Sequence, residues 1–167
     1  MEIVVYTQYY RCKSPERQRE IDDCLRRNLN NPSISLVVVF VEADAPPLPD
    51  STVPIETVDS KSRITYADWL RSVRKQRDGI ALLLNADIYL DSGLDCLGET
   101  FSSSDVFLAL TRYNPGISGF HLNEFPHWTQ DVWGVRADAE LPDSLLYASS
   151  FPIGFPGCDN RIAYVMW

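Results

Sequence analysis

Long apolar runs, histidines and paired cysteines are scarce in this sequence of 167 residues. The longest apolar runs fall short of the roughly 20 residues that a membrane-spanning helix needs. No charged-then-apolar leader precedes the first expected strand. We therefore expect a cytoplasmic protein without an evident association with membranes. The four cysteines show no Cys-x-x-Cys spacing, so we interpret them as reduced thiols rather than a disulfide or zinc framework.

Positive charge is scarce in the second half of the chain. Residues 84–167 contain 3 basic and 11 acidic side chains, whereas residues 1–83 contain 12 of each, and the net charge is −8. A general nucleic-acid binder needs a basic face, so this distribution argues against nucleic acid as a partner. It is compatible with a negatively charged ligand that is held by a few arginines and a metal ion.

The hydrophobic pattern predicts strands that alternate with helices. Hydrophobic residues make up 45% of the chain and charged residues 23%, which is typical of one folded globular domain. Strands are expected over residues 2–6, 34–41, 55–58, 80–84, 106–111 and 131–136. Helices are expected after Ser14, which can cap the residues up to Asn30, after Thr65, over 92–100 and over 161–167, and residues 112–129 are expected to form a long loop. This order predicts an α/β fold with a mostly parallel central sheet flanked by helices.

The strand Ile80–Leu84 is the stretch around which the rest is organised. Its five apolar residues predict a strand buried on both faces. Asn85, Ala86 and Asp87 follow it directly. Ligands in open α/β sheets bind outside the carboxyl ends of the strands, where an acid can hold a hard cation such as Mg²⁺ or Mn²⁺. The alternative is that Asn85 and Asp87 only shape the turn, because both residue types favour turns.

Over nearly its whole length the chain resembles small nucleotide-sugar glycosyltransferases of the GT-A fold. The opening β-α-β half is similar, and Asn85-Ala-Asp87 resembles the Asp-x-Asp motif of that family. The strand from Gln130 to Arg136 takes the place of the acceptor-side strand, and Gly157-Cys-Asp-Asn160 resembles the x-Glu-Asp motif of inverting members. Asn85 replaces the first Asp of the Asp-x-Asp motif, and Cys158 replaces the Glu of the x-Glu-Asp motif.

The resemblance implies a nucleotide-binding half, residues 1–90, and an acceptor-side half, residues 91–167. Asp87 would bind a divalent cation, Mn²⁺ or Mg²⁺, that bridges the diphosphate of a nucleotide-diphosphate-sugar donor. The other residues expected to contact the donor are Thr7, Gln8, Tyr9, Arg11, Arg63, Asn85 and Ala86. A further ligand that many family members carry beyond the last helix would have to come from a partner chain or a second copy.

The second half supplies the candidates for catalysis and acceptor binding. Asp159 would act as the general base that deprotonates an acceptor hydroxyl, although an Asp at this position can equally be a helix N-cap. Asp131 is the second candidate base, or a ligand for sugar hydroxyls. Tyr113, Trp128 and Trp133 could stack on a carbohydrate acceptor, with core packing as the alternative for Trp133.

Three functions follow from these motifs. The first is metal-dependent transfer of a sugar to a hydroxyl acceptor, with inversion if the base assignment holds. The second is a non-catalytic domain or subunit that binds sugars or nucleotides. The third is a nucleotidyltransferase, which ranks lower because the residues after the first strand contain no glycine-rich phosphate loop.

Overall fold

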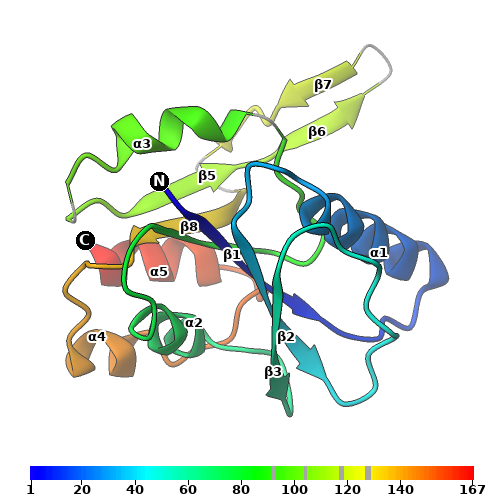
Figure 1. The fold of residues 1–167 in the computed structure, drawn as a ribbon, viewed down its shortest axis with the longest axis horizontal. Coiled ribbons are helices and arrows are strands. Elements are labelled where there is room, and N and C mark those ends of the chain that lie inside the picture. Colours follow the sequence, from blue (N-terminus) through cyan, green and yellow to red (C-terminus); the bar gives the residue numbers. More distant parts are fainter. Residues whose placement is uncertain (92, 104, 117–118, 127–128) are drawn as a thin grey trace.

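The computed structural model describes residues 1–91, 93–103, 105–116, 119–126 and 129–167. Its central sheet contains β1 (Ile3–Tyr9), β2 (Leu36–Glu42), β3 (Ile55–Ser60), β4 (Ile80–Leu84), β5 (Leu108–Thr111) and β8 (Gln130–Arg136). The strand order is β3-β2-β1-β4-β8-β5 (Figure 1). The first four pair in parallel, and β8 runs antiparallel to both of its neighbours. The prediction of an α/β fold with a mostly parallel sheet is confirmed.

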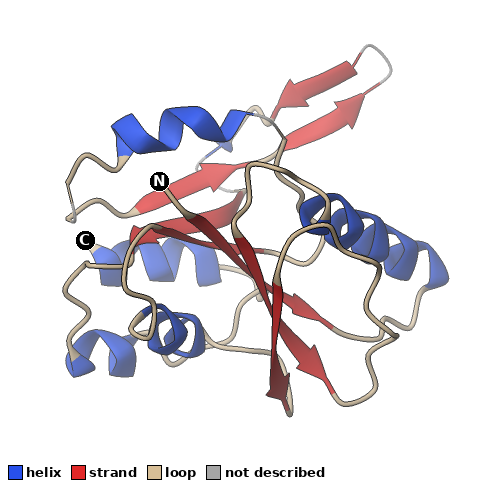
Figure 2. Ribbon diagram, viewed as in Figure 1, coloured by secondary structure: helices blue, strands red, loops and turns tan. Residues whose placement is uncertain are grey.

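Helices cover both faces of this sheet (Figure 2). They are α1 (Pro15–Leu29), α2 (Tyr66–Val73), α3 (Leu97–Thr100), α4 (Asp143–Ala148) and α5 (Cys158–Met166), and a short 3₁₀ helix, η1 (Gly93–Cys96), precedes α3. One core lies between the sheet and α1, η1 and α3. The other lies between the sheet and α2, α4 and α5. Within the described residues, no helix has the length and apolar character needed to cross a membrane.

The strand β4 is buried along its whole length because it lies between β1 and β8 under helices on both faces. This explains why its sequence is a continuous apolar run rather than an alternating one. Leu83 faces the core under α2, and its neighbours Leu82 and Leu84 face the core under α1. The position of β4 fixes the backbone that leads into Asn85 and Asp87.

The two predicted helix starts are confirmed. The Ser14 side chain accepts a hydrogen bond from the Arg17 backbone N–H, and Pro15 occupies the first turn of α1. At α2 the Thr65 hydroxyl accepts from the Asp68 N–H, and the Asp68 carboxylate accepts from the Thr65 N–H. These contacts satisfy backbone donors that the first turn of a helix leaves without partners.

Replacing Thr65 with alanine is expected to lower the free energy of unfolding by about 1 kcal/mol, because the N-cap acceptor of α2 is lost. Urea unfolding followed by circular dichroism measures the difference. Thr65→Ser keeps the hydroxyl and serves as the control. An equal loss in both variants would assign the effect to the threonine methyl group rather than to the cap.

The structure differs from the sequence predictions at several boundaries. The first strand continues to Tyr9 because Thr7 and Tyr9 still pair with Val39 and Val41 of β2. The expected loop over 112–129 contains a hairpin of β6 (Tyr113–Gly116) and β7 (Gly119–Leu122), which extends away from the central sheet in Figure 1. The helix α4 was not predicted, and α5 begins three residues before the expected start.

Candidate functional site

A pocket of about 410 Å³ opens at the edge of the sheet where β1 and β4 end and β8 begins. Because β8 is antiparallel, its first residues reach the same edge as the carboxyl ends of its neighbours. The residues that line the pocket are Gln8, Tyr10, Arg17, Arg63, Asn85, Ala86, Asp87, Arg112, Asp131, Ile153 and Gly154. The pocket thus combines two carboxylates with three guanidinium groups at the edge where α/β sheets bind ligands.

The first carboxylate, Asp87, is paired with an arginine from α1. The Arg17 Nη2 atom donates to Asp87 Oδ2 at 2.7 Å, while Arg17 Nη1 contacts Glu20 Oε2 at 2.5 Å. The side chain of Asp87 is 20% exposed and that of Arg17 is 40% exposed. The pair therefore lies at the mouth of the pocket, where a ligand can reach both groups.

The second carboxylate, Asp131, lies deeper. Asn85 Nδ2 donates to Asp131 Oδ1 at 2.7 Å, and Arg112 Nη1 donates to Asp131 Oδ2 at 2.6 Å. Burial raises the pKa of Asp131, and the charge of Asp87 raises it further, while the bonds from Asn85 and Arg112 lower it. A carboxylate whose pKa is raised by burial is a stronger base than one in water.

The third guanidinium group, Arg63, pairs with no carboxylate among the described residues. It lies 5.2 Å from the centre of the Tyr10 ring and 5.8 Å from that of Phe155, and Nη1 donates to the Gly154 carbonyl at 3.4 Å. A β-carbon on Gly154 would lie 2.8 Å from Arg63 Nη1, and the φ of Gly154 is +71°. Glycine here allows the close approach of the guanidinium group to the backbone. Burial also raises the pKa of Tyr10. Its hydroxyl, which is protonated at neutral pH as in any tyrosine, can donate a hydrogen bond.

The residue Gln8 shapes the wall of the pocket. Its amide oxygen accepts from the Ile64 N–H at 3.1 Å, and its nitrogen donates to Glu42 Oε1 at 2.6 Å and to the Ser62 carbonyl at 3.3 Å. These bonds join the end of β1 to the loop that carries Arg63. With the side chain 2% exposed, Gln8 positions its neighbours more than it reaches a ligand.

A cation in this pocket would have to take most of its coordination from a ligand. Among the described residues, no group of three or more His, Cys, Asp and Glu side chains is arranged to hold a metal ion. Magnesium is nevertheless commonly bound by one or two carboxylates together with substrate phosphates. Asp87 could supply one such carboxylate after releasing Arg17, whereas both oxygens of Asp131 already accept hydrogen bonds, from Asn85 and Arg112.

The pocket brings together six of the residues selected from the sequence: Gln8, Arg63, Asn85, Ala86, Asp87 and Asp131. The sequence also predicts that Thr7 and Tyr9 contact the donor from a loop after the first strand. This is corrected for both, because they lie within β1. Their side chains are buried, and the Tyr9 hydroxyl donates to Asp22 Oδ1 at 2.8 Å on the α1 side of the sheet. Arg11 bonds to the Asp44 carbonyl at 2.9 Å, outside the described lining.

The expected acceptor residues lie elsewhere. Trp133 is 0% exposed and packs edge-on against Tyr66, with ring centres 5.1 Å apart. The structure favours the alternative of core packing over an acceptor contact, because the position of Trp133 in the middle of β8 turns the ring into the core. Tyr113 is 63% exposed on the hairpin and does not line the pocket. Trp128 lies outside the described residues.

Asp159 occupies the first turn of α5 and is not among the residues described as lining the pocket. Its Oδ1 atom accepts from the N–H of the next residue, Asn160, at 2.9 Å. The preceding residue, Cys158, is buried and accepts a hydrogen bond from the Tyr66 hydroxyl at 3.5 Å. Of the two candidate bases, Asp131 is therefore the one that faces the pocket.

Sequence reasoning missed Tyr10, Arg17, Arg112, Ile153 and Gly154. A signal was available for Arg112, because it directly follows β5 and so reaches the same edge of the sheet. Arg17 reaches the pocket because the first turn of α1 begins beside the end of β1. Ile153 and Gly154 lie in the loop before α5, and no local motif predicts that they line the pocket.

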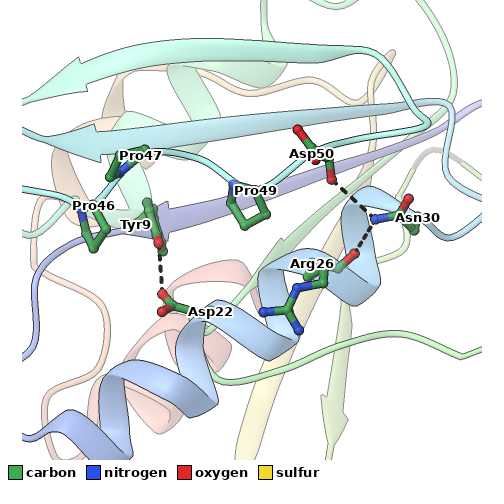
Figure 3. Close-up of a pocket in the computed structure, with 8 residues that line it drawn as sticks. All are labelled: Tyr9, Asp22, Arg26, Asn30, Pro46, Pro47, Pro49 and Asp50. Atoms are coloured by element: carbon green, nitrogen blue, oxygen red, sulfur yellow. Dashed lines mark hydrogen bonds between the residues drawn. The ribbon is translucent and has the colours of Figure 1, made fainter.

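A second hollow of about 460 Å³ lies between α1 and the proline-rich loop that contains Pro46, Pro47 and Pro49. Figure 3 shows Tyr9, Pro46, Pro47 and Pro49 on one side of it, and Asp22 and Arg26 of α1 with Asn30 at the end of that helix on the other. The Asn30 side chain donates to the carbonyls of Arg26 and Asp50. These bonds hold the proline-rich loop against α1, so we assign this hollow a structural role.

No protein-family model matches the sequence, and a comparison with curated proteins gave no match. Among solved structures, HddC from Yersinia pseudotuberculosis is similar over 94% of this chain and 83% of its own, with 10% sequence identity and a TM-score of 0.43. Similarity at this level says nothing about the reaction that the pocket supports.

Proposed function

We propose that the pocket binds a nucleotide-diphosphate-sugar and that the protein transfers the sugar to a hydroxyl acceptor, as a GT-A fold glycosyltransferase does. The observation that carries this proposal is the convergence of Arg17, Arg63 and Arg112 with two carboxylates at one edge of the sheet. A guanidinium group matches the geometry of phosphate oxygens and binds them with paired hydrogen bonds. Three such groups suit a diphosphate better than a neutral ligand.

Asp131 is the residue to which we assign proton transfer. A carboxylate can accept about four hydrogen bonds, and the bonds from Asn85 and Arg112 use two of them. Capacity therefore remains for an acceptor hydroxyl, whose proton Asp131 would take as the hydroxyl oxygen attacks the sugar. Attack from the face opposite the leaving diphosphate would invert the configuration at the reacting carbon.

Asp87 would hold the divalent cation, Mn²⁺ or Mg²⁺. When bound, this cation would neutralise charge on the leaving diphosphate. Arg63, which has no carboxylate partner among the described residues, is available to the phosphates directly. The Tyr10 hydroxyl, protonated at neutral pH, can donate a further hydrogen bond at the same wall.

One feature favours a second candidate, a domain that binds the ligand without turnover. Both carboxylates of the pocket are held by arginines, at 2.7 Å for Asp87 and 2.6 Å for Asp131. If these pairs persist with ligand bound, Asp87 cannot take a cation, and the charge of Arg112 lowers the pKa of Asp131 and so weakens it as a base. Release of nucleoside diphosphate from a bound donor distinguishes the two candidates.

The first test is the thermal stability of the protein with a panel of nucleoside diphosphates and their sugars, with and without Mn²⁺. A ligand at a hundred times its dissociation constant raises the free energy of unfolding by about 2.7 kcal/mol. We expect at least one donor to stabilise the protein in a Mn²⁺-dependent manner. We expect Asp87→Asn to remove the Mn²⁺-dependent part, because the amide is a poor ligand for a hard cation.

Asp95→Asn is the matched control for Asp87→Asn. Asp95 is exposed in η1 and does not line the pocket, so this variant should respond to ligands as the unmodified protein does. If Mn²⁺-dependent stabilisation is unchanged in Asp87→Asn, Asp87 is not the carboxylate that binds the cation. No stabilisation by any nucleotide would contradict the proposed function itself.

A further inference from the structure

The ion pair between Arg17 and Asp87 joins two segments that are distant in sequence. Arg17 belongs to the first two turns of α1, and Asp87 belongs to the loop after β4. The Arg17 guanidinium group has a second carboxylate partner, Glu20, one turn further along the helix. The group therefore has an alternative anchor on its own helix that does not involve Asp87.

A cation at Asp87 and the guanidinium group of Arg17 compete for the same carboxylate. The Arg17 Nη2 atom occupies Asp87 Oδ2 at 2.7 Å. Two positive charges a few ångströms apart repel each other, and the repulsion grows as a pocket excludes water. Asp131 already accepts from Asn85 and Arg112, so a move of Arg17 to Asp131 would place two guanidinium groups on one carboxylate.

We propose that Arg17 exchanges partners during ligand binding: it covers Asp87 in the empty pocket and moves to a phosphate oxygen when a divalent cation takes that carboxylate. Arg17 is thus a positioning residue that couples the cation to the anion. Glu20 keeps the guanidinium group at the mouth of the pocket during the exchange. The phosphate half of this inference rests on the proposed donor, and the competition for Asp87 rests only on the cation proposed there.

The exchange has two opposite consequences for Arg17→Gln. Without a ligand, the variant should bind Mn²⁺ about two- to fivefold more tightly, because a partly exposed ion pair no longer opposes the cation. With Mn²⁺ present, it should bind a nucleoside diphosphate several-fold more weakly, because a phosphate contact is missing. A residue with a purely structural role would not change these two affinities in opposite directions.

Both affinities are measured on the full chain. Isothermal titration with Mn²⁺ alone, checked by electron paramagnetic resonance of free Mn²⁺, gives the first, and titration with uridine and guanosine diphosphates in Mn²⁺ gives the second. Arg19→Gln is the matched control, since it removes the same charge from α1 while Arg19 contacts only Glu16, at 3.5 Å, among the described salt-bridge partners. Asp87→Asn combined with Arg17→Gln should show no gain in Mn²⁺ affinity.

The outcomes separate this inference from the proposed function. Tighter Mn²⁺ binding in Arg17→Gln than in Arg19→Gln, with weaker diphosphate binding, supports the exchange. Equal Mn²⁺ affinities in Arg17→Gln and Arg19→Gln overturn the exchange. The absence of Mn²⁺ binding from both variants also overturns it, even if nucleotides still stabilise the protein through Asp87. Tighter Mn²⁺ binding without any nucleotide binding supports the competition at Asp87, overturns the transfer of Arg17 to phosphate and contradicts the proposed function.

Discussion

Replacing Asp131 with asparagine is expected to lower turnover of the donor at least about a hundredfold, the usual minimum contribution of a general base. Asparagine keeps the size of the side chain and can still accept from Asn85 or Arg112, but it cannot take a proton from an acceptor hydroxyl. The measurement is the release of nucleoside diphosphate from the donor that stabilises the protein most. Donor affinity should change much less than the rate, because Asp131 lies on the side of the pocket assigned to proton transfer.

The pH dependence of the turnover rate tests the role of Asp131 independently. Burial raises the pKa of Asp131, and a general base works only in its ionised form. The rate should therefore be low below this raised pKa, increase as the pH rises through it and level off above it. Asp131→Asn should lack this acidic limb, whereas a variant that only disturbs the fold should keep it.

Asp159→Asn is the comparison that decides between the two candidate bases. Asp159 lies on α5 outside the described lining of the pocket, so its loss should change turnover by less than about threefold, far below the contribution of a general base. A large loss of turnover in Asp159→Asn together with full turnover in Asp131→Asn would assign the role of general base to Asp159. Circular dichroism of both variants checks that the fold is intact.

Replacing Trp133 with alanine is expected to lower the free energy of unfolding by about 3–5 kcal/mol, the usual cost of deleting a buried tryptophan. The ring is 0% exposed and fills the core between β8 and Tyr66. Because a domain is stabilised by only about 5–15 kcal/mol in total, this single change removes a large share of the stability. Urea unfolding measures the loss, as a lower transition midpoint.

Trp133→Phe tests the same position if the alanine variant does not fold. The indole Nε1 atom has no hydrogen-bond partner among the described residues, so phenylalanine loses volume but no hydrogen bond. We expect a smaller loss of stability and unchanged donor affinity. A loss of acceptor binding without a loss of stability would instead restore the role of Trp133 as an acceptor contact.

The corrected positions share a physical cause. Thr7 and Gln8 are polar and follow an apolar run, so a local pattern assigns them to a loop. In the folded protein they continue β1, because β2 and β4 on either side supply hydrogen-bond partners up to Tyr9 and Thr7 respectively. Trp133 likewise has a surface that suits a sugar, but the pairing of β8 with β4 and β5 places it inside a sheet whose two faces are both covered.

Local chemistry by itself determined most elements of the first half of the chain and one end of the site. The apolar run of β4, the Ser14 and Thr65 caps and the turn at Asn85 are properties of short segments, because burial on both faces, capping and turn geometry act over a few residues. The sequence therefore placed Asn85 and Asp87 correctly at a carboxyl edge.

The rest of the pocket was decided only by the tertiary structure. The antiparallel insertion of β8 between β4 and β5 brings Asp131 against Asn85, 46 positions away in the chain. The packing of α1 against the sheet brings Arg17 to Asp87, 70 positions away. Such contacts depend on strand order and helix placement. These follow from the burial of all the apolar faces together, so no single motif predicts them.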